Sequence, residues 1–140
     1  MAESLESLEV KRQELIQALA RVGDFRRGTI SVNYRKCGKR NCACACADHP
    51  GHGPQYLWIA TIGGKGRARN LRLEPELEKV EREVAAYRTF VRVCAELVEV
   101  NEQICDLRPV RDLAEVRELA ALKRELRRRF ARKSRARSRG

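Results

Sequence analysis

The sequence predicts an α+β protein in which a small three-stranded antiparallel β module is inserted between coiled-coil-like helices, with a C-terminal helix and a basic tail. Two patterns in the 140 residues carry this prediction. Apolar residues recur at alternating spacings of three and four before residue 23 and after residue 74, as in a coiled-coil seam. Between these stretches, β-branched and aromatic residues alternate as they do in strands, and glycines mark a tight turn.

The N-terminal segment, residues 1–23, is expected to form a helix over residues 3–22. Its repeating positions are Leu5, Leu8, Arg12, Leu15, Leu19 and Val22. Gly23 follows the last of them and suits a C-terminal cap, because glycine adopts the left-handed conformation that such caps need. This helix is the natural partner for a second helix with the same repeat.

Residues 26–73 are expected to form the β module. Residues 29–34 alternate as a first strand, and residues 55–62 are rich in aromatic and β-branched side chains. Gly63 and Gly64 supply the positive φ angles of a hairpin turn, after which residues 67–73 return as the third strand. The residues between the first and second strands therefore form one long loop.

A long helix is expected over residues 74–108, with Pro75 at its first turn. The predicted seam comprises Leu77, Val80, Val84, Tyr87, Val91, Cys94, Val98, Asn101 and Cys105, and a second apolar row comprises Phe90, Leu97 and Ile104. Asn101 either fixes the register of the seam or marks its fraying end. Pro109 is expected to break the helix, which leaves a C-terminal helix over residues 109–130 and a disordered basic tail over residues 131–140.

The loop between the first two strands holds four of the six cysteines and both histidines of the chain. These six residues are Cys37, Cys42, Cys44, Cys46, His49 and His52. Thiolates and imidazoles at this density predict one tetrahedral zinc ion per chain. Free thiols, disulfides formed in vitro and an iron–sulfur cluster are the alternatives, although the histidines favour zinc.

Cys37, Cys42 and Cys44 are the first three predicted ligands. The fourth is His52 or Cys46, and His52 is preferred because the glycines on both sides of it allow the chain to turn sharply and close the loop. Cys46 and His49 are then alternates. Asp48 is the only carboxylate between Asp24 and Glu74, so the loop lacks the acids and bases of a hydrolytic site, and no enzymatic activity is expected.

The net charge of +11 is concentrated in two blocks, residues 26–72 and residues 123–140, while the remaining segments are mildly acidic. Two concentrated basic blocks are typical of a protein that binds a polyanion. The predicted phosphate contacts are Arg35, Lys36, Lys39, Arg40, Lys65, Arg67, Arg69, Arg72, Arg127, Arg128 and Arg129. Tyr56 and Trp58 could stack on bases, but packing within the small sheet is the preferred interpretation. No base-reading helix is recognisable, and DNA and RNA are not distinguished.

No window of the sequence has the unbroken apolar span of a membrane helix, and the acidic start lacks the pattern of a secretory signal. A cytoplasmic protein without membrane contact is therefore expected. In that reducing compartment clustered cysteines bind metal more often than they form disulfides.

Residues 28–58 resemble a family of small, functionally uncharacterised bacterial and archaeal proteins. The residues that carry the resemblance are Gly28, Tyr34, Cys37, Gly38, Lys39, Cys42, Cys44, His52, Gly53, Pro54, Tyr56 and Trp58. The resemblance implies a cysteine/histidine metal site with Cys37, Cys42, Cys44 and His52 as ligands, and genes that lie near mobile elements. Cys46 and His49 depart from the family pattern.

Taken together, the sequence predicts a non-enzymatic, zinc-binding accessory protein that binds nucleic acid through the β module and the basic tail. The helices would form a homodimer or dock onto a larger protein, such as a mobile-element enzyme. The alternative is a protein-interaction or scaffold subunit in which the zinc is purely structural. A thiol redox protein is a third hypothesis.

Overall fold

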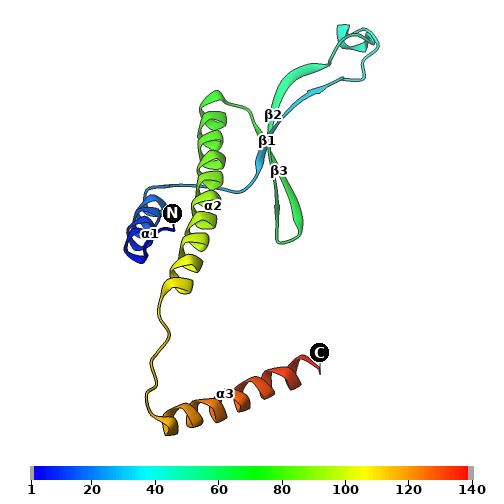
Figure 1. Ribbon diagram of the computed structural model, residues 1–140. Helices are drawn as coiled ribbons and strands as arrows, with labels where there is room; N and C mark the ends of the chain where they lie inside the picture. Colours follow the sequence, from blue (N-terminus) through cyan, green and yellow to red (C-terminus); the bar gives the residue numbers. More distant parts are fainter. Residues whose placement is uncertain (1, 139–140) are drawn as a thin grey trace. The chain divides into compact units, whose positions relative to one another are not determined.

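The computed structural model describes residues 2–138, which belong to two compact units, Met1–Asp106 and Leu107–Gly140. The elements are α1 (Leu5–Ala20), β1 (Thr29–Arg35), the single 3-10 turn η1 (Ala43–Ala45), β2 (His52–Ile62), β3 (Lys65–Leu71), α2 (Glu74–Leu107) and α3 (Val116–Arg137), all shown in Figure 1. The predicted α+β fold class is confirmed, since a three-stranded antiparallel sheet lies between helices.

The sheet has the order β1-β2-β3, and both strand pairs are antiparallel. Gly63 and Gly64 have φ angles of 59° and 76°, which is the conformation that the predicted two-residue hairpin turn requires. Ile30, Tyr56, Trp58 and Leu71 occupy one face of the sheet and pack against the first half of α2. We call this the inner face, and the opposite face of the sheet the outer face.

Because the sheet is open, β1 and β3 are both edge strands. The two edges differ in charge: β3 carries Lys65, Arg67 and Arg69, whereas β1 carries no charged residue before Arg35 at its end. Cations on an edge discourage pairing with further strands. Val32 and Tyr34 of β1 are half-exposed beside that uncharged edge.

α2 buries different faces in its two halves. Val80 and Val84 in its first half join Leu71 in one hydrophobic cluster, and Val100 and Ile104 in its second half join Leu8 of α1 in another. At 100° per residue, Val100 lies about 160° around the helix axis from Val80. The sheet and α1 accordingly lie on different sides of α2 (Figure 1).

The main seam predicted for α2 is therefore wrong in its second half, whereas Ile104 of the predicted second row is buried. Val91 and Val98 are 46% and 56% exposed and Cys105 is exposed, while Val93 and Val100 are buried. The physical reason is that two different partners contact α2, one at each end, and each selects its own face. A straight helix also drifts by about 20° per heptad from a strict seven-residue repeat.

The α1 pattern agrees with the structure more closely. All six predicted seam positions of α1 and the segment after it are buried or half-buried. Arg12 donates a hydrogen bond of 3.4 Å to the side-chain oxygen of Asn101, whose amide nitrogen binds the Leu97 carbonyl at 2.9 Å. Asn101 thus joins α1 to α2 at one fixed register.

The chain between α1 and β1 is fixed to α2 by aromatic and ionic contacts. Phe25 stacks on Phe90 with ring centroids 4.6 Å apart. Arg26 pairs with Glu83 at 3.2 Å and lies over the ring of Trp58, 5.3 Å from its centroid. The Trp58 indole N–H donates to the Arg27 carbonyl at 2.9 Å. These contacts hold the sheet against α2.

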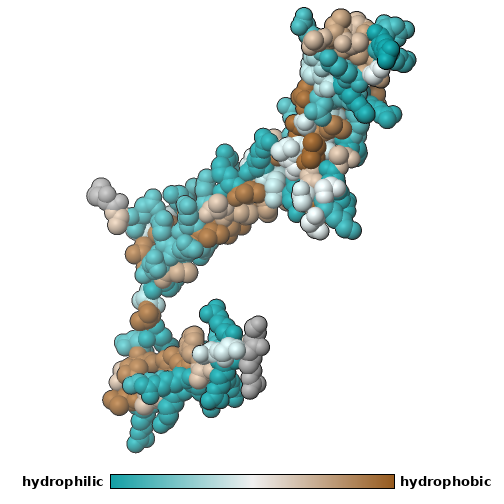
Figure 2. Space-filling model, turned by 90° about the vertical axis from the view of Figure 1, so that its right-hand side faces the viewer, coloured by the Kyte–Doolittle hydropathy of each residue, from teal (hydrophilic) through white to brown (hydrophobic). Residues whose placement is uncertain are grey.

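The C-terminal unit corrects the prediction of a helix at residues 109–130 followed by a disordered tail. α3 begins at Val116 and continues to Arg137; residues 139–140 lie outside the described part. Arginine, lysine and alanine are good helix formers, and Arg129 pairs with Glu125 one turn earlier. None of the described residues of α3 is buried, and its apolar strip is visible between hydrophilic side chains in the lower body of Figure 2.

Within residues 2–138, no helix is both long and apolar enough to cross a membrane.

Candidate metal centre and basic surface

The loop between β1 and β2 brings together three thiols and one imidazole. The ligand atoms of Cys37, Cys42, Cys44 and His52 all lie within 4.8 Å of one another. The Cys37 and Cys44 sulfurs are 3.4 Å apart, and the Cys42 sulfur is 3.3 Å from Nε2 of His52. Cys44 is buried, whereas Cys37 and His52 are exposed. These are the four residues that the sequence analysis preferred.

Local backbone geometry explains why these four side chains converge. Cys42 and Cys44 flank the start of η1, and the loop returns to the sheet at Gly51. Gly51 has a φ of 110°, and a Cβ atom there would lie 2.7 Å from the backbone of Arg35. Only glycine allows this close approach, which brings His52 opposite Arg35 at the end of β1.

The donor set fits zinc. Three sulfurs and one nitrogen form a Cys₃His set, and tetrahedral bonds of about 2.3 Å to sulfur require sulfurs separated by roughly 3.8 Å. The separations in this cluster, from 3.3 Å to at most 4.8 Å, bracket that value. An ion bound by Cys37, Cys42, Cys44 and His52 would have four protein ligands, which is typical of a structural site.

The groups around Cys37 favour its thiolate form, which is the form that binds a cation. The backbone N–H of Lys39 and then the His52 side chain lower the pKa of Cys37 to about 6. Cys44 accepts the N–H of Cys37 at 3.4 Å, which lowers its pKa, but desolvation and the neighbouring thiols outweigh this, so the pKa of Cys44 is raised. The cluster thus supplies a thiolate at neutral pH, and a cation would complete the deprotonation.

Cys46 and His49, the alternate ligands, are not part of this cluster. Cys46 is exposed, and its carbonyl accepts a hydrogen bond of 3.0 Å from the Lys36 ammonium group. His49 accepts the N–H of Gly51 at 3.0 Å through Nδ1. Both residues therefore stabilise the fold of the loop.

The predicted phosphate contacts are spread along the molecule. Arg35, Lys36, Lys39 and Arg40 lie at the metal loop, and Lys65, Arg67, Arg69 and Arg72 lie on or after β3. Arg127, Arg128 and Arg129 lie on α3. Arg69 pairs with Glu76 at 3.2 Å and Lys36 binds within the loop, so these two cations are already engaged.

The cations of the loop between β1 and β2 are far along the sheet from those beside the hairpin turn. The metal loop joins the start of β2, whereas the turn before Lys65 follows its end, and Figure 1 shows these at opposite ends of the sheet. The 11 residues of β2 span roughly 35 Å at about 3.3 Å per residue. Arg67 and Arg69 lie opposite Ala60 and Trp58 on the inner face, whereas Arg72 alternates onto the outer face, so the cations are spread along β3 and over both faces of the sheet.

Tyr56 and Trp58 pack against the cluster of Leu71, Val80 and Val84, as the preferred interpretation predicted. Their rings are half-buried on the inner face. The outer face, for which no role was predicted from the sequence, exposes Gln55 and Asn70. Strand alternation combined with the hairpin register would have found these residues.

Comparison with known proteins gives one family. The family described as a domain of unknown function, DUF6788, matches residues 5–82, which include α1, the sheet, the Cys/His cluster and the start of α2. No curated protein and no solved structure matches the chain. Because the match covers more than half of the 140 residues, the chain belongs to the DUF6788 family.

Proposed function

We propose that this protein is a non-enzymatic zinc-binding module that binds nucleic acid, with the cations of the sheet and of α3 contacting phosphates. The cluster of Cys37, Cys42, Cys44 and His52 would hold one zinc ion and fix the loop that carries Lys39 and Arg40. The helices would dimerise the module or dock it onto a larger protein. The family resemblance, in which genes lie near mobile elements, makes a mobile-element enzyme one candidate for that larger protein.

The observation that carries this proposal is a set of unpaired cations on the loop between β1 and β2 and on the sheet. Within residues 2–138, the side chains of Arg35, Lys39, Arg40 and Arg67 enter no hydrogen bond or ion pair. Unpaired cations at fixed positions can contact phosphates without first breaking an internal contact. Arg35 and Arg67 lie opposite His52 and Ala60 of β2, eight residues and roughly 26 Å apart at about 3.3 Å per residue, so they can contact separate phosphates of one strand.

Binding to DNA and RNA fragments over a range of salt concentrations tests the proposal. Changing Arg35, Arg40 and Arg67 to alanine should weaken binding and reduce the salt dependence, by roughly 0.9 in the log–log slope for each lost phosphate contact on DNA. The matched control changes Arg82, Arg88 and Arg92 of α2 to alanine. It removes the same charge and should leave the slope nearly unchanged.

The alternative function is a protein-interaction or scaffold subunit with a purely structural zinc. The exposed Val91 and Val98 on α2 support it, because such an apolar row suits a helical partner. Equal loss of binding in the two triple variants would favour this alternative, since general charge would then suffice. Removal of residues 107–140 separates the contribution of α3, because those residues form their own compact unit.

A further inference from the structure

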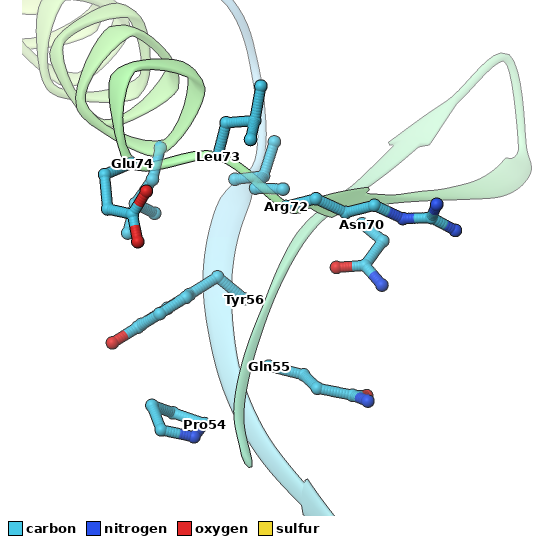
Figure 3. A pocket seen from close by; sticks show the side chains of 9 residues that line it. Pro54, Gln55, Tyr56, Asn70, Arg72, Leu73 and Glu74 are labelled. Carbon is cyan, nitrogen blue, oxygen red and sulfur yellow. The ribbon is translucent and has the colours of Figure 1, made fainter.

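The outer face of the sheet carries uncharged amide side chains beside one arginine. Alternation from the buried inner-face residues places Gln55 and Leu57 of β2 on this face, with Asn70 opposite Leu57 and Arg72 next along the chain. Gln55, Asn70 and Arg72 are exposed. Figure 3 shows these three side chains pointing to the side of the sheet away from the Tyr56 ring.

These three side chains are not engaged in polar contacts with other described residues. Within residues 2–138, Gln55, Asn70 and Arg72 make no side-chain hydrogen bond or ion pair. On β1, Asn33 lies opposite Gln55 and accepts a hydrogen bond of 3.2 Å from Ser31. Two free amide groups and a free guanidinium group thus share one surface that α2 does not cover.

The chemistry of this surface matches the edges of base pairs. Glutamine and asparagine bind adenine through two hydrogen bonds, arginine binds guanine in the same way, and aliphatic groups such as Leu57 contact the thymine methyl. The centre lines of β2 and β3 are about 4.8 Å apart, so this strand pair fits a major groove about 12 Å wide. The major groove of A-form RNA is too narrow for side chains to read.

Single-stranded nucleic acid is disfavoured by the same face. Recognition of unpaired bases depends on stacking against aromatic rings or arginine planes. Tyr56 and Trp58 of β2 lie on the inner face, and Trp58 is fixed there by Arg26 and Arg27. The outer face therefore offers hydrogen bonds in a plane and no aromatic platform.

We propose that the outer face reads base pairs in the major groove of duplex DNA through Gln55, Asn70 and Arg72. This inference rests on the proposed nucleic-acid function and adds sequence specificity to it. The metal loop adjoins the Gln55 end of β2, so Arg35 and the loop cations contact the flanking phosphates while the outer face contacts the bases.

Selection from a library of randomised duplex DNA, with the full-length zinc-loaded protein, tests this proposal. The wild-type protein should enrich a preferred site and bind it at least about tenfold more tightly than a scrambled duplex. Changing Gln55 and Arg72 together to alanine should remove most of this preference. Arg72→Lys should retain overall affinity and salt dependence. It should lose the preference for guanine at the base that Arg72 contacts, because lysine cannot form the two parallel hydrogen bonds of a guanidinium group.

The control changes Gln103 and Arg92 of α2 to alanine, which removes the same two chemical groups from an exposed helix surface. It should select the same site as the wild-type protein. Zinc content and circular dichroism confirm that each variant is folded. Binding without any sequence preference, or a preference that survives Gln55→Ala with Arg72→Ala, would overturn the inference and leave the proposed function standing. Absence of binding to every nucleic acid would overturn both.

Discussion

At the scale of single residues, Cys37 and Cys46 show how position decides the chemistry of two exposed thiols in one loop. The sulfur of Cys37 lies within 4.8 Å of the other cluster atoms, and its pKa is lowered to about 6. Cys46 lies two residues after a member of the cluster and contributes only its backbone carbonyl, to Lys36. The two thiols should therefore respond differently to the same substitution.

Cys37→Ser should abolish stoichiometric zinc binding, with a loss of affinity exceeding the roughly 10- to 100-fold that follows removal of an outer-shell partner. Cys46→Ser should retain one zinc per chain. Metal analysis of freshly reduced protein and a competition titration with a chelator measure both. Equal zinc loss in the two variants would show that Cys46 is a ligand.

Glu83→Gln should lower the free energy of unfolding at pH 7 by about 1–2 kcal/mol, because Glu83 is paired with Arg26 and Lys79 and is only 13% exposed. Desolvation raises the pKa of Glu83, but the hydrogen bond from Lys79 and the charge of Arg26 lower it overall. A lowered pKa means that the pair stabilises the fold above the ordinary value of 4.5 and loses this effect as the pH falls through the folded-state pKa.

Urea unfolding of the wild-type protein and the Glu83→Gln variant at a series of pH values checks this. The difference between the two proteins should be largest near neutrality and should shrink below pH 4.5. Comparing the two proteins at each pH cancels the effect of acid on the metal cluster. A difference that stayed constant down to pH 3 would exclude the ionic contribution.

The four residues of the Cys/His cluster were largely predictable from the sequence, and the pairing of the sheet cations was not. Thiol and imidazole groups have few other uses at such density, and the glycines around His52 indicate where the loop closes. The engagement of Arg69 by Glu76 depends on the hairpin register and the angle of α2 against the sheet. Those two quantities arise from tertiary packing, which the local sequence pattern does not encode.

At the scale of elements, α2 shows where periodicity succeeds and where it fails. Its limits were predicted closely, because Pro75 and Pro109 mark its ends. Its buried faces were not, because Val80 and Val98 belong to the same predicted row yet are 0% and 56% exposed. A repeat identifies which residues can be buried, and the position of each partner decides which of them are.

Val80→Ala and Val98→Ala form a matched pair that measures this difference. Val80→Ala should cost about 2 kcal/mol, from lost apolar burial and the cavity left behind. Val98→Ala should change the free energy of unfolding by less than about 0.5 kcal/mol, as for other surface substitutions. Urea unfolding at one pH checks both. Comparable losses would indicate that Val98 is covered in solution, as by a second copy of the chain.

For α3, in contrast to α2, the limits of the helix were not predicted closely. Its composition suggested a disordered end, and the structure extends the helix to Arg137 because helix propensity continues after the apolar pattern fades at Phe130. Its described residues bury no side chain. Its boundaries were therefore the least predictable feature of the fold.

At the scale of the whole molecule, the two compact units should behave independently. Removal of residues 107–140 should leave the zinc content of the first unit unchanged and shift its thermal midpoint by less than about 2 °C, because no described side chain of α3 is buried. Calorimetry and metal analysis of the shortened and full-length chains check this. A larger shift would show that the C-terminal unit stabilises the first.

The unequal edges of the sheet limit how this protein can polymerise. A fibre that grows strand by strand requires both edge strands of every copy to pair with a neighbour, just as step-growth polymerisation requires two reactive groups on each monomer. Here β3 is blocked by Lys65, Arg67 and Arg69, so only β1 can accept a neighbour. Two copies that met through β1 would present only blocked edges to a third. Growth would stop at two, even when the protein is highly concentrated.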